Sequence, residues 1–326
     1  MLASKRKNSL TMPSILHNHP QFRDLLGIVA KELKILPVLV EKDYWIMHSL
    51  WGLQQMGLNF QLKGGTSLSK GFGIIDRFSE DIDVLIVPPQ ELEVKTGKNH
   101  DKPAHRESRR KFYDYLAETI SIDGIESVRR DHAFDDAEKY RSGGVRLIYR
   151  NRFSVADGLK EGILLEVGFD DVTPNRPCDI SSWAYDYAAR KISLVDNRAK
   201  AVYCYEPGYT LVEKLQTIST KYRQWQETGQ KPVNFIRHYY DVYCLLKTPA
   251  VLRFIGSAEY EAHKNKRFRK DDNPVMANND AFVLRHVNAR KTFQDAYAQA
   301  SILYSKTHPS FDEILETIHA AIDNGL

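Results

Sequence analysis

The sequence predicts an α/β (α+β) protein in which a region of helices and strands is followed by a mostly helical region. Short apolar stretches of strand length, such as 81–87 and 162–170, occur between segments with apolar residues at helical spacing. From about Tyr205 onwards the helical spacing predominates. With 326 residues the chain can bury a substantial core, enough for two domains or one bilobal unit.

Composition places the chain among soluble proteins of ordinary charge. The net charge of +4 is modest and identifies no partner by itself. No run approaches the ~20 apolar residues that a membrane span needs, and the basic residues 1–19 lack an apolar signal core, so we expect a flexible leader rather than a secretion signal. The three cysteines (Cys178, Cys204 and Cys244) are widely spaced, which favours reduced thiols in a cytoplasmic protein.

Two helices are expected before the first strand. Segment 21–36 is amphipathic and is ended by a proline, and segment 38–56 continues with apolar residues at helical spacing. Glu41, Lys42 and Asp43 together interrupt the apolar face of the second helix. They could form a solvated first turn, or Lys42 or Asp43 could reach a binding site; the residues alone favour the solvated turn.

A glycine turn follows a short strand expected at about 59–62. The segment KGGTSLSKGF (63–72) begins with Gly64 and Gly65, which allow a tight turn and the close approach of a ligand. We expect Thr66 and Ser67 to lie at the start of the next helix, where free N–H groups and the helix dipole favour an anion such as phosphate.

Two aspartates share one face of the strand that comes next. Because side chains alternate along a strand, Asp81 and Asp83 point to one side while Ile82 and Val84 point to the other. Two adjacent like charges repel unless a cation or protons neutralise them. Carboxylate oxygens suit Mg²⁺ that is held partly by substrate phosphates. The stretch therefore predicts a phosphate cradle followed by a metal site.

A third carboxylate lies in a later apolar strand. Segments 141–150 and 162–170 are expected to pair, and Glu166 interrupts the apolar run of the second. A buried carboxylate needs a partner. Arg146 on the neighbouring strand is one candidate, and a metal site is the other; strand position alone does not decide between them. The nearby aspartate pair makes Glu166 the better third ligand of that site.

Further helices are expected at 107–121, 210–225, 234–246, 281–304 and 311–323. Two basic stretches accompany them, at 105–111 and at 262–272, the second with an interleaved phenylalanine. Such stretches can hold a nucleic-acid backbone and stack on a base, but a solvated face or loop is the more common explanation.

The order of these motifs resembles the DNA polymerase β-type nucleotidyltransferase pattern: GG-[TS] opening a helix, D-x-D in an apolar strand, then a carboxylate in a later strand. More specifically, the chain resembles the AbiEii/AbiGii toxin family of type IV toxin–antitoxin systems, which is related to the MenT toxins. The resemblance covers about residues 38–250. It is carried by VEKDYWI (40–46), KGGTSLSKGF (63–72), DRFSEDIDVLI (76–86), TLVEKL (210–215) and RHYYDVYCLL (237–246).

The resemblance implies a polymerase β-type mixed sheet with helices, followed by a helical lobe that closes over it. We therefore expect a nucleotidyltransferase-like domain at 20–205 and a helical C-terminal domain at 206–326, with the second completing the site. Family motifs imply that Asp81 and Asp83 bind the metal, with Glu166 added from its strand position, and that Lys214 and Asp241 are functional. The expected phosphate-binding residues are Gly64, Gly65, Thr66, Ser67 and Lys70.

The activity implied by the resemblance is Mg²⁺- or Mn²⁺-dependent transfer of a nucleotide from an NTP. In the related MenT toxins the acceptor is the tRNA 3′ end, so RNA is the expected acceptor and a cognate antitoxin a possible partner; no membrane is expected. Two alternatives stay open: a non-catalytic nucleotide-binding or partner-binding protein on the same scaffold, and nucleotidyl transfer to a protein or small molecule. The intact aspartate pair favours catalysis, because a scaffold has no reason to retain that repulsion.

Overall fold

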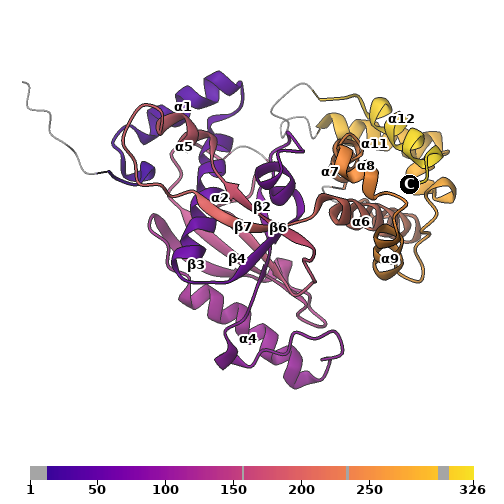
Figure 1. The fold of residues 1–326 in the computed structure, drawn as a ribbon, viewed down its shortest axis with the longest axis horizontal. Helices are drawn as coiled ribbons and strands as arrows, with labels where there is room; N and C mark the ends of the chain where they lie inside the picture. Colours follow the sequence, from indigo (N-terminus) through magenta and orange to yellow (C-terminus); the bar gives the residue numbers. More distant parts are fainter. Residues whose placement is uncertain (1–12, 156–157, 233–234, 300–307) are drawn as a thin grey trace, which may run out of the picture.

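A mixed β-sheet forms the centre of the first two-thirds of the protein (Figure 1). The computed structural model describes residues 13–155, 158–232, 235–299 and 308–326. In this part of the chain seven strands form one sheet in the order β3-β4-β5-β2-β1-β7-β6. The strands are β1 (Phe60–Lys63), β2 (Asp81–Ile86), β3 (Ile125–Asp131), β4 (Ser142–Tyr149), β5 (Ile163–Gly168), β6 (Asn175–Ile180) and β7 (Ala199–Tyr205).

The centre of the sheet combines both strand directions. β2 runs antiparallel to β1 and parallel to β5, while β1 also runs parallel to β7. The expected pairing of segments 141–150 and 162–170 is confirmed, since β4 and β5 are antiparallel neighbours. β3, β6 and β7 were not anticipated. β3 and β6 contain few apolar residues, and buried and exposed positions do not alternate regularly along β7, so the period-2 signal is weak in all three.

The helices that surround the sheet come from the first 188 residues of the chain. α2 packs against β5 and β7, and α1 and α5 pack against α2, whereas α4 packs against β3 and β4. These helices are α1 (Phe22–Leu33), α2 (Pro37–Gln55), α4 (Pro103–Thr119) and α5 (Trp183–Ala188). A short helical segment after β1 comprises α3 (Gly64–Thr66) and a π-helical turn at Ser67–Gly71.

The helical lobe lies to one side of the sheet (Figure 1). It comprises α6 (Pro207–Thr228), α7 (Arg237–Leu246), α8 (Pro249–Phe254), α9 (Ala258–Arg267), α10 (Asp280–Val283), α11 (Val287–Gln299) and α12 (Phe311–Asp323). The helix expected at 281–304 is divided between α10 and α11, and residues 300–304 lie outside the described part of the chain. None of the described helices is long and apolar enough to cross a membrane.

Two hydrophobic cores correspond to the sheet region and the helical lobe. The first is built from residues between Leu16 and Cys204, and the second from residues 211–326 together with Leu68 and Ile75 of the glycine-turn region. The proposed boundary at 205/206 falls between β7 and α6. The second core is therefore completed by side chains from the first two-thirds of the chain.

Two expectations for the N-terminal region are wrong. The leader assigned to 1–19 is too long: Leu16 is fully buried in the first core and the residues up to 12 lie outside the described structure. The solvated turn is also wrong, because Glu41, Lys42 and Asp43 are only 0%, 2% and 1% exposed. α2 is buried on nearly all sides from Val38 to Leu50, so its charged residues have to be paired inside the protein.

Candidate active site

Three carboxylates lie together at the centre of the sheet. In the parallel pairing of β2 with β5, Asp83 is the register partner of Glu166, and Asp81 lies two residues before Asp83 on the same face. All three line one cavity of about 530 Å³. Arg146 is not the partner of Glu166: it stands opposite Leu164 and its guanidinium binds Asp131 instead.

Burial and repulsion between neighbouring carboxylates raise the pKa values of Glu166 and Asp83. Burial and the charges of Asp83 and Asp81 raise the pKa of Glu166 to about 7. Burial raises the pKa of Asp83 as well; Lys63 and Lys214 act against it, and the charge of Asp81 adds to it. The cluster therefore favours any cation that can replace the protons.

The carboxylates have the chemistry that a hard divalent cation requires. Asp81 Oδ1 is buried and accepts no hydrogen bond from a described residue, and carboxylate oxygens are the preferred ligands of Mg²⁺. Within residues 13–155, 158–232, 235–299 and 308–326, no group of three or more acidic, histidine or cysteine side chains is placed to hold a metal ion by itself. The residues fit an ion that is held partly by a substrate, as Mg²⁺–nucleotide is.

The ammonium group of Lys160 forms an ion pair with the second carboxylate oxygen of Asp81. Its Nζ lies 2.6 Å from Asp81 Oδ2 and 4.7 Å from the centre of the Phe134 ring. Lys42 and Glu80 fix this loop: Glu80 Oε1 accepts hydrogen bonds from Lys42 Nζ and from the Lys160 backbone N–H, each at 3.0 Å. A cation that binds this oxygen has to displace the Lys160 ammonium. Lysines of irregular loops have no distinctive pattern, which is why the sequence did not identify Lys160.

The glycine turn is shaped by contact with Asp83 of β2 and with Ser79 just before that strand. Gly64 has φ +68°, and a Cβ at this position would lie 1.9 Å from Asp83 Oδ2. A Cβ on Gly65 would lie 2.5 Å from Ser79 Oγ. Both glycines are thus required by close approach, and the left-handed φ adds to the requirement at Gly64.

The expected phosphate-binding set is only partly assembled. Gly65 lines the cavity, whereas the Thr66 side chain is buried and donates to the Asp81 carbonyl at 2.6 Å, and Ser67 is buried beside Cys204. Lys70 faces away from the cavity because its ammonium pairs with the buried Asp43 carboxylate at 2.6 Å. The prediction that Lys70 binds phosphate here is therefore not supported.

The helical lobe supplies the opposite, basic wall. Lys214, Thr217 and Lys221 come from α6, and Arg237 and His238 come from α7. Burial lowers the pKa of Lys221, and the neighbouring charges of Arg237 and Lys214 lower it further. Burial, Lys214 and Arg237 hold the pKa of His238 well below its usual range, so the ring is neutral. Crowded cations of this kind favour a polyanionic ligand.

Asp241 does not line the cavity, but it pairs with two cations that do: Lys214 of α6 and Arg77 of the segment before β2. It is fully buried, and its two oxygens accept hydrogen bonds from Arg77 Nε at 2.6 Å and Nη2 at 2.7 Å. Lys214 Nζ lies 3.0 Å from Asp241 Oδ2. Burial opposes ionisation of Asp241, but the charges of Arg77 and Lys214 outweigh it and hold the pKa below its usual range. Asp241 is thus a positioning residue.

Several cavity residues were missed from the sequence: Arg77, Lys160, Lys221, Arg237 and His238. Helical spacing could have identified two of them. Lys221 is seven residues after Lys214, which places both on one face of α6, and Arg237 is four residues before Asp241 on α7.

The two basic stretches do not line the cavity. In the first, Arg109 is buried and donates to backbone carbonyls, among them those of Lys139 and Lys95. In the second, which is mostly α9 rather than a loop, Lys266 and Arg267 pair with Asp171 and Asp170 after β5. Arg109, Lys266 and Arg267 therefore bind groups of the protein itself.

Comparisons with known proteins identify one family. The model of the family described as "Nucleotidyl transferase AbiEii toxin, Type IV TA system" matches residues 46–317, most of the chain. No curated protein gives a significant match. Among solved structures, the chain is similar to an antigenic nucleotidyltransferase-like protein from Paracoccidioides brasiliensis. That similarity has 11% identity and a TM-score of 0.36, and covers 83% of this chain and 97% of the other.

Proposed function

The chain belongs to the AbiEii family of nucleotidyl transferase toxins of type IV toxin–antitoxin systems, and we propose that it transfers a nucleotide from an NTP to the 3′ end of tRNA with Mg²⁺ or Mn²⁺. The observation that carries the proposal is one cavity with an acidic wall and a basic wall, from the sheet and the helical lobe respectively. A cation together with a polyphosphate is the ligand that neutralises both walls.

The acidic wall would hold the divalent ion through Asp81 and Asp83, with Glu166 as the third carboxylate. When bound, the ion supplies charge neutralisation at the reacting phosphorus and orients the groups for in-line displacement. Glu166 has the further role of accepting the proton of the acceptor hydroxyl. A bound cation favours the ionised form of this carboxylate, which is the form that accepts a proton.

The basic wall would bind the triphosphate and retain the pyrophosphate leaving group. Lys214, Lys221 and Arg237 face the carboxylates across the cavity, and Arg77 joins them from the segment before β2. Asp241 fixes Arg77 and Lys214, so the two cations are positioned before substrate arrives. Such preorganisation removes much of the cost of orienting charged groups during the reaction.

The expected acceptor and partners are those that the family resemblance implies. A toxin of a type IV system implies a cognate antitoxin, and the use of NTPs and tRNA would fit a reaction in the cytoplasm. Because the two basic stretches lie outside the cavity, support for RNA comes from the resemblance to tRNA-modifying relatives and from the basic wall of the cavity.

The test is a transfer assay with each of the four labelled NTPs, Mg²⁺ and total tRNA. We expect the wild-type protein to label tRNA with at least one NTP and the Asp81→Asn, Asp83→Asn double variant to label none. Parallel reactions with total protein and with small-molecule acceptors separate the alternative acceptors. Absence of label on RNA with every NTP contradicts the proposed acceptor, and equal labelling by the double variant contradicts the metal-site assignment.

A further inference from the structure

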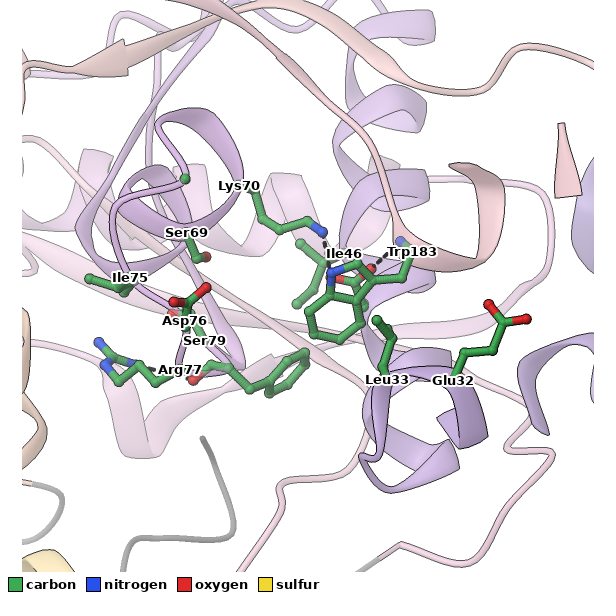
Figure 2. Close-up of a pocket in the computed structure, with 13 residues that line it drawn as sticks. Glu32, Leu33, Ile46, Ser69, Lys70, Ile75, Asp76, Arg77, Ser79 and Trp183 are labelled. Carbon is green, nitrogen blue, oxygen red and sulfur yellow. Dashed lines mark hydrogen bonds and ion pairs between the residues drawn. The ribbon is translucent and has the colours of Figure 1, made fainter. Parts of the chain in front are cut away.

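A second cavity of about 320 Å³ adjoins the catalytic one (Figure 2). Arg77 and Ser79 line both cavities, so the two are separated by the segment that leads into β2. The other walls come from α1, α2, the turn after α3, and the first residue of α5. A base bound in this cavity would therefore lie next to two residues that also line the catalytic one.

One wall of this cavity is apolar and aromatic. Trp183 presents its indole beside Phe78, with 6.4 Å between the ring centres, and Ile46 and Leu33 extend the apolar surface. Trp183 is only partly buried and Leu33 is exposed, so the wall is accessible. A flat aromatic side chain at an accessible cavity is a platform on which a planar ring can stack.

The polar groups of the cavity are gathered around the same indole. Lys70 Nζ lies 4.9 Å from the centre of the Trp183 ring and 2.6 Å from Asp43 Oδ1 (Figure 2). Asp43 Oδ2 accepts a hydrogen bond from the Trp183 backbone N–H at 2.8 Å. The ammonium has three protons and Asp43 accounts for one of them. Ser69 and Ser79 add hydroxyl groups to the lining.

A cavity with an aromatic wall and with charged and hydroxyl groups at its edge has the chemistry of a nucleobase site. Bases are recognised by stacking on an aromatic face and by hydrogen bonds to their edges. The volume is near the lower end of small-ligand sites, roughly 300–1,000 Å³, which suits a nucleoside rather than a whole nucleoside triphosphate.

We propose that this cavity is the subsite for a nucleobase, with Trp183 as its stacking platform and Lys70, held in place by the buried Asp43 carboxylate, contacting the edge of the base. The proposal rests on the proposed function, because it assigns the polyphosphate of the same or a second nucleotide to the catalytic cavity. The base belongs either to the NTP or to the terminal nucleotide of the acceptor.

The test measures binding, so it needs no turnover. Equilibrium dialysis with Mg²⁺ compares labelled NTPs with inorganic tripolyphosphate, which lacks a base, for wild type, Trp183→Ala and Trp183→Phe. Loss of one stacking platform is expected to weaken NTP binding on the order of tenfold in Trp183→Ala and to leave tripolyphosphate binding unchanged. Trp183→Phe keeps an aromatic ring and is expected to retain most of the NTP affinity.

A second arm identifies the source of the base. If Trp183→Ala binds NTPs like the wild type but binds a short oligonucleotide of the tRNA 3′ sequence more weakly, the base is that of the acceptor. If both ligands bind normally, or if NTP and tripolyphosphate weaken equally, the nucleobase subsite is wrong. Selective loss of base binding in a protein whose wild type labels no acceptor would keep the subsite and refute the proposed transfer.

The ion pair has a separate prediction. Asp43→Asn combined with Lys70→Met removes both charges together, so no single charge is left buried without its partner. We expect the affinities for the four NTPs to converge, with tripolyphosphate affinity unchanged. Unaltered base selectivity in this double variant would contradict a role for the pair at the base edge.

Discussion

Glu166 is a residue whose ionisation opposes folding. Its pKa is about 7 in the folded protein against 4.5 for the free side chain, so the folded state binds the proton more tightly than the unfolded state does. Between about pH 4.5 and pH 7 the folded state carries more protons. The free energy of unfolding therefore falls as the pH rises through this range, by on the order of 2–3 kcal/mol in the absence of a divalent cation.

Glu166→Gln should remove this fall, because glutamine does not titrate. We expect the variant and the wild type to have similar stability below about pH 4.5, and the variant to be the more stable above pH 7. Thermal unfolding without divalent cations, measured from pH 4 to pH 8, checks this. Glu161→Gln alters an exposed glutamate paired with Arg129 and is the control; a curve for Glu166→Gln parallel to that of the wild type would refute the assignment.

Asp241 is the residue on which the basic wall depends. Asp241→Asn removes the buried carboxylate charge that both Arg77 and Lys214 contact, and we expect a loss of about 3–5 kcal/mol in the free energy of unfolding. Urea denaturation measures it. Asp312→Asn removes a charge from an exposed pair with Arg290 and should cost no more than about 1 kcal/mol. Similar losses of unfolding free energy in the two variants would mean that the buried ion pairs of Asp241 stabilise the protein no more than an exposed pair does.

At the scale of elements, the turn between β1 and α3 determines where β2 can place the Asp83 side chain. Gly64→Ala meets two penalties: a left-handed φ, and a Cβ in the space of Asp83 Oδ2. Gly57→Ala meets only the first, since Gly57 has φ +75° and open space around it. Each should lose about 1–2 kcal/mol of stability from backbone strain.

Only Gly64→Ala should also lose activity, on the order of 100-fold, because a misplaced Asp83 no longer positions the reacting groups. Transfer assays on the two variants at a temperature where both are folded separate the effects. Equal activity in Gly64→Ala and Gly57→Ala would show that Asp83 tolerates the shift.

α2 is the element that ties the loops of the site together. Glu41 accepts hydrogen bonds from the backbone N–H groups of Arg152 and Phe153. Lys42 donates a hydrogen bond to Glu80, and Asp43 forms an ion pair with Lys70. Three successive charged residues on a buried helix point in three directions, and each one binds a different loop. Their burial explains why they interrupt an otherwise apolar helix.

At the scale of the whole molecule, the two lobes share a hydrophobic core and a buried ion pair as well as a cavity. Leu68 and Ile75 complete the core of the helical lobe, and Asp241 of that lobe neutralises Arg77 of the other. Separation at the proposed 205/206 boundary would expose both the apolar contact and a buried charge.

Fragments 1–205 and 206–326 are therefore expected to lack cooperative unfolding when expressed apart. Far-UV circular dichroism and dye binding to exposed apolar surface measure this, with the intact chain as the control. Sharp, independent thermal transitions in both fragments would show that each lobe folds alone and that the shared contacts are dispensable.

The sequence by itself determined the parts of this protein that depend on local periodicity. The period of two placed Asp81 and Asp83 on one face of β2, helical spacing identified most of the helices, and the order of the motifs indicated the family. The third carboxylate, Glu166, was also found in this way, because a charge inside an apolar strand has few explanations.

Only the tertiary structure decided which charged residues face which. It paired Lys70 with Asp43 outside the cavity of the three carboxylates and buried Asp241 against Arg77 and Lys214. It also brought Lys160 to Asp81 across 79 residues of chain. Charges interact through space, and a pairing between distant segments leaves no periodic signal in either one. The acidic wall could be predicted from one strand and its neighbour, whereas the basic wall exists only once the helical lobe is in place.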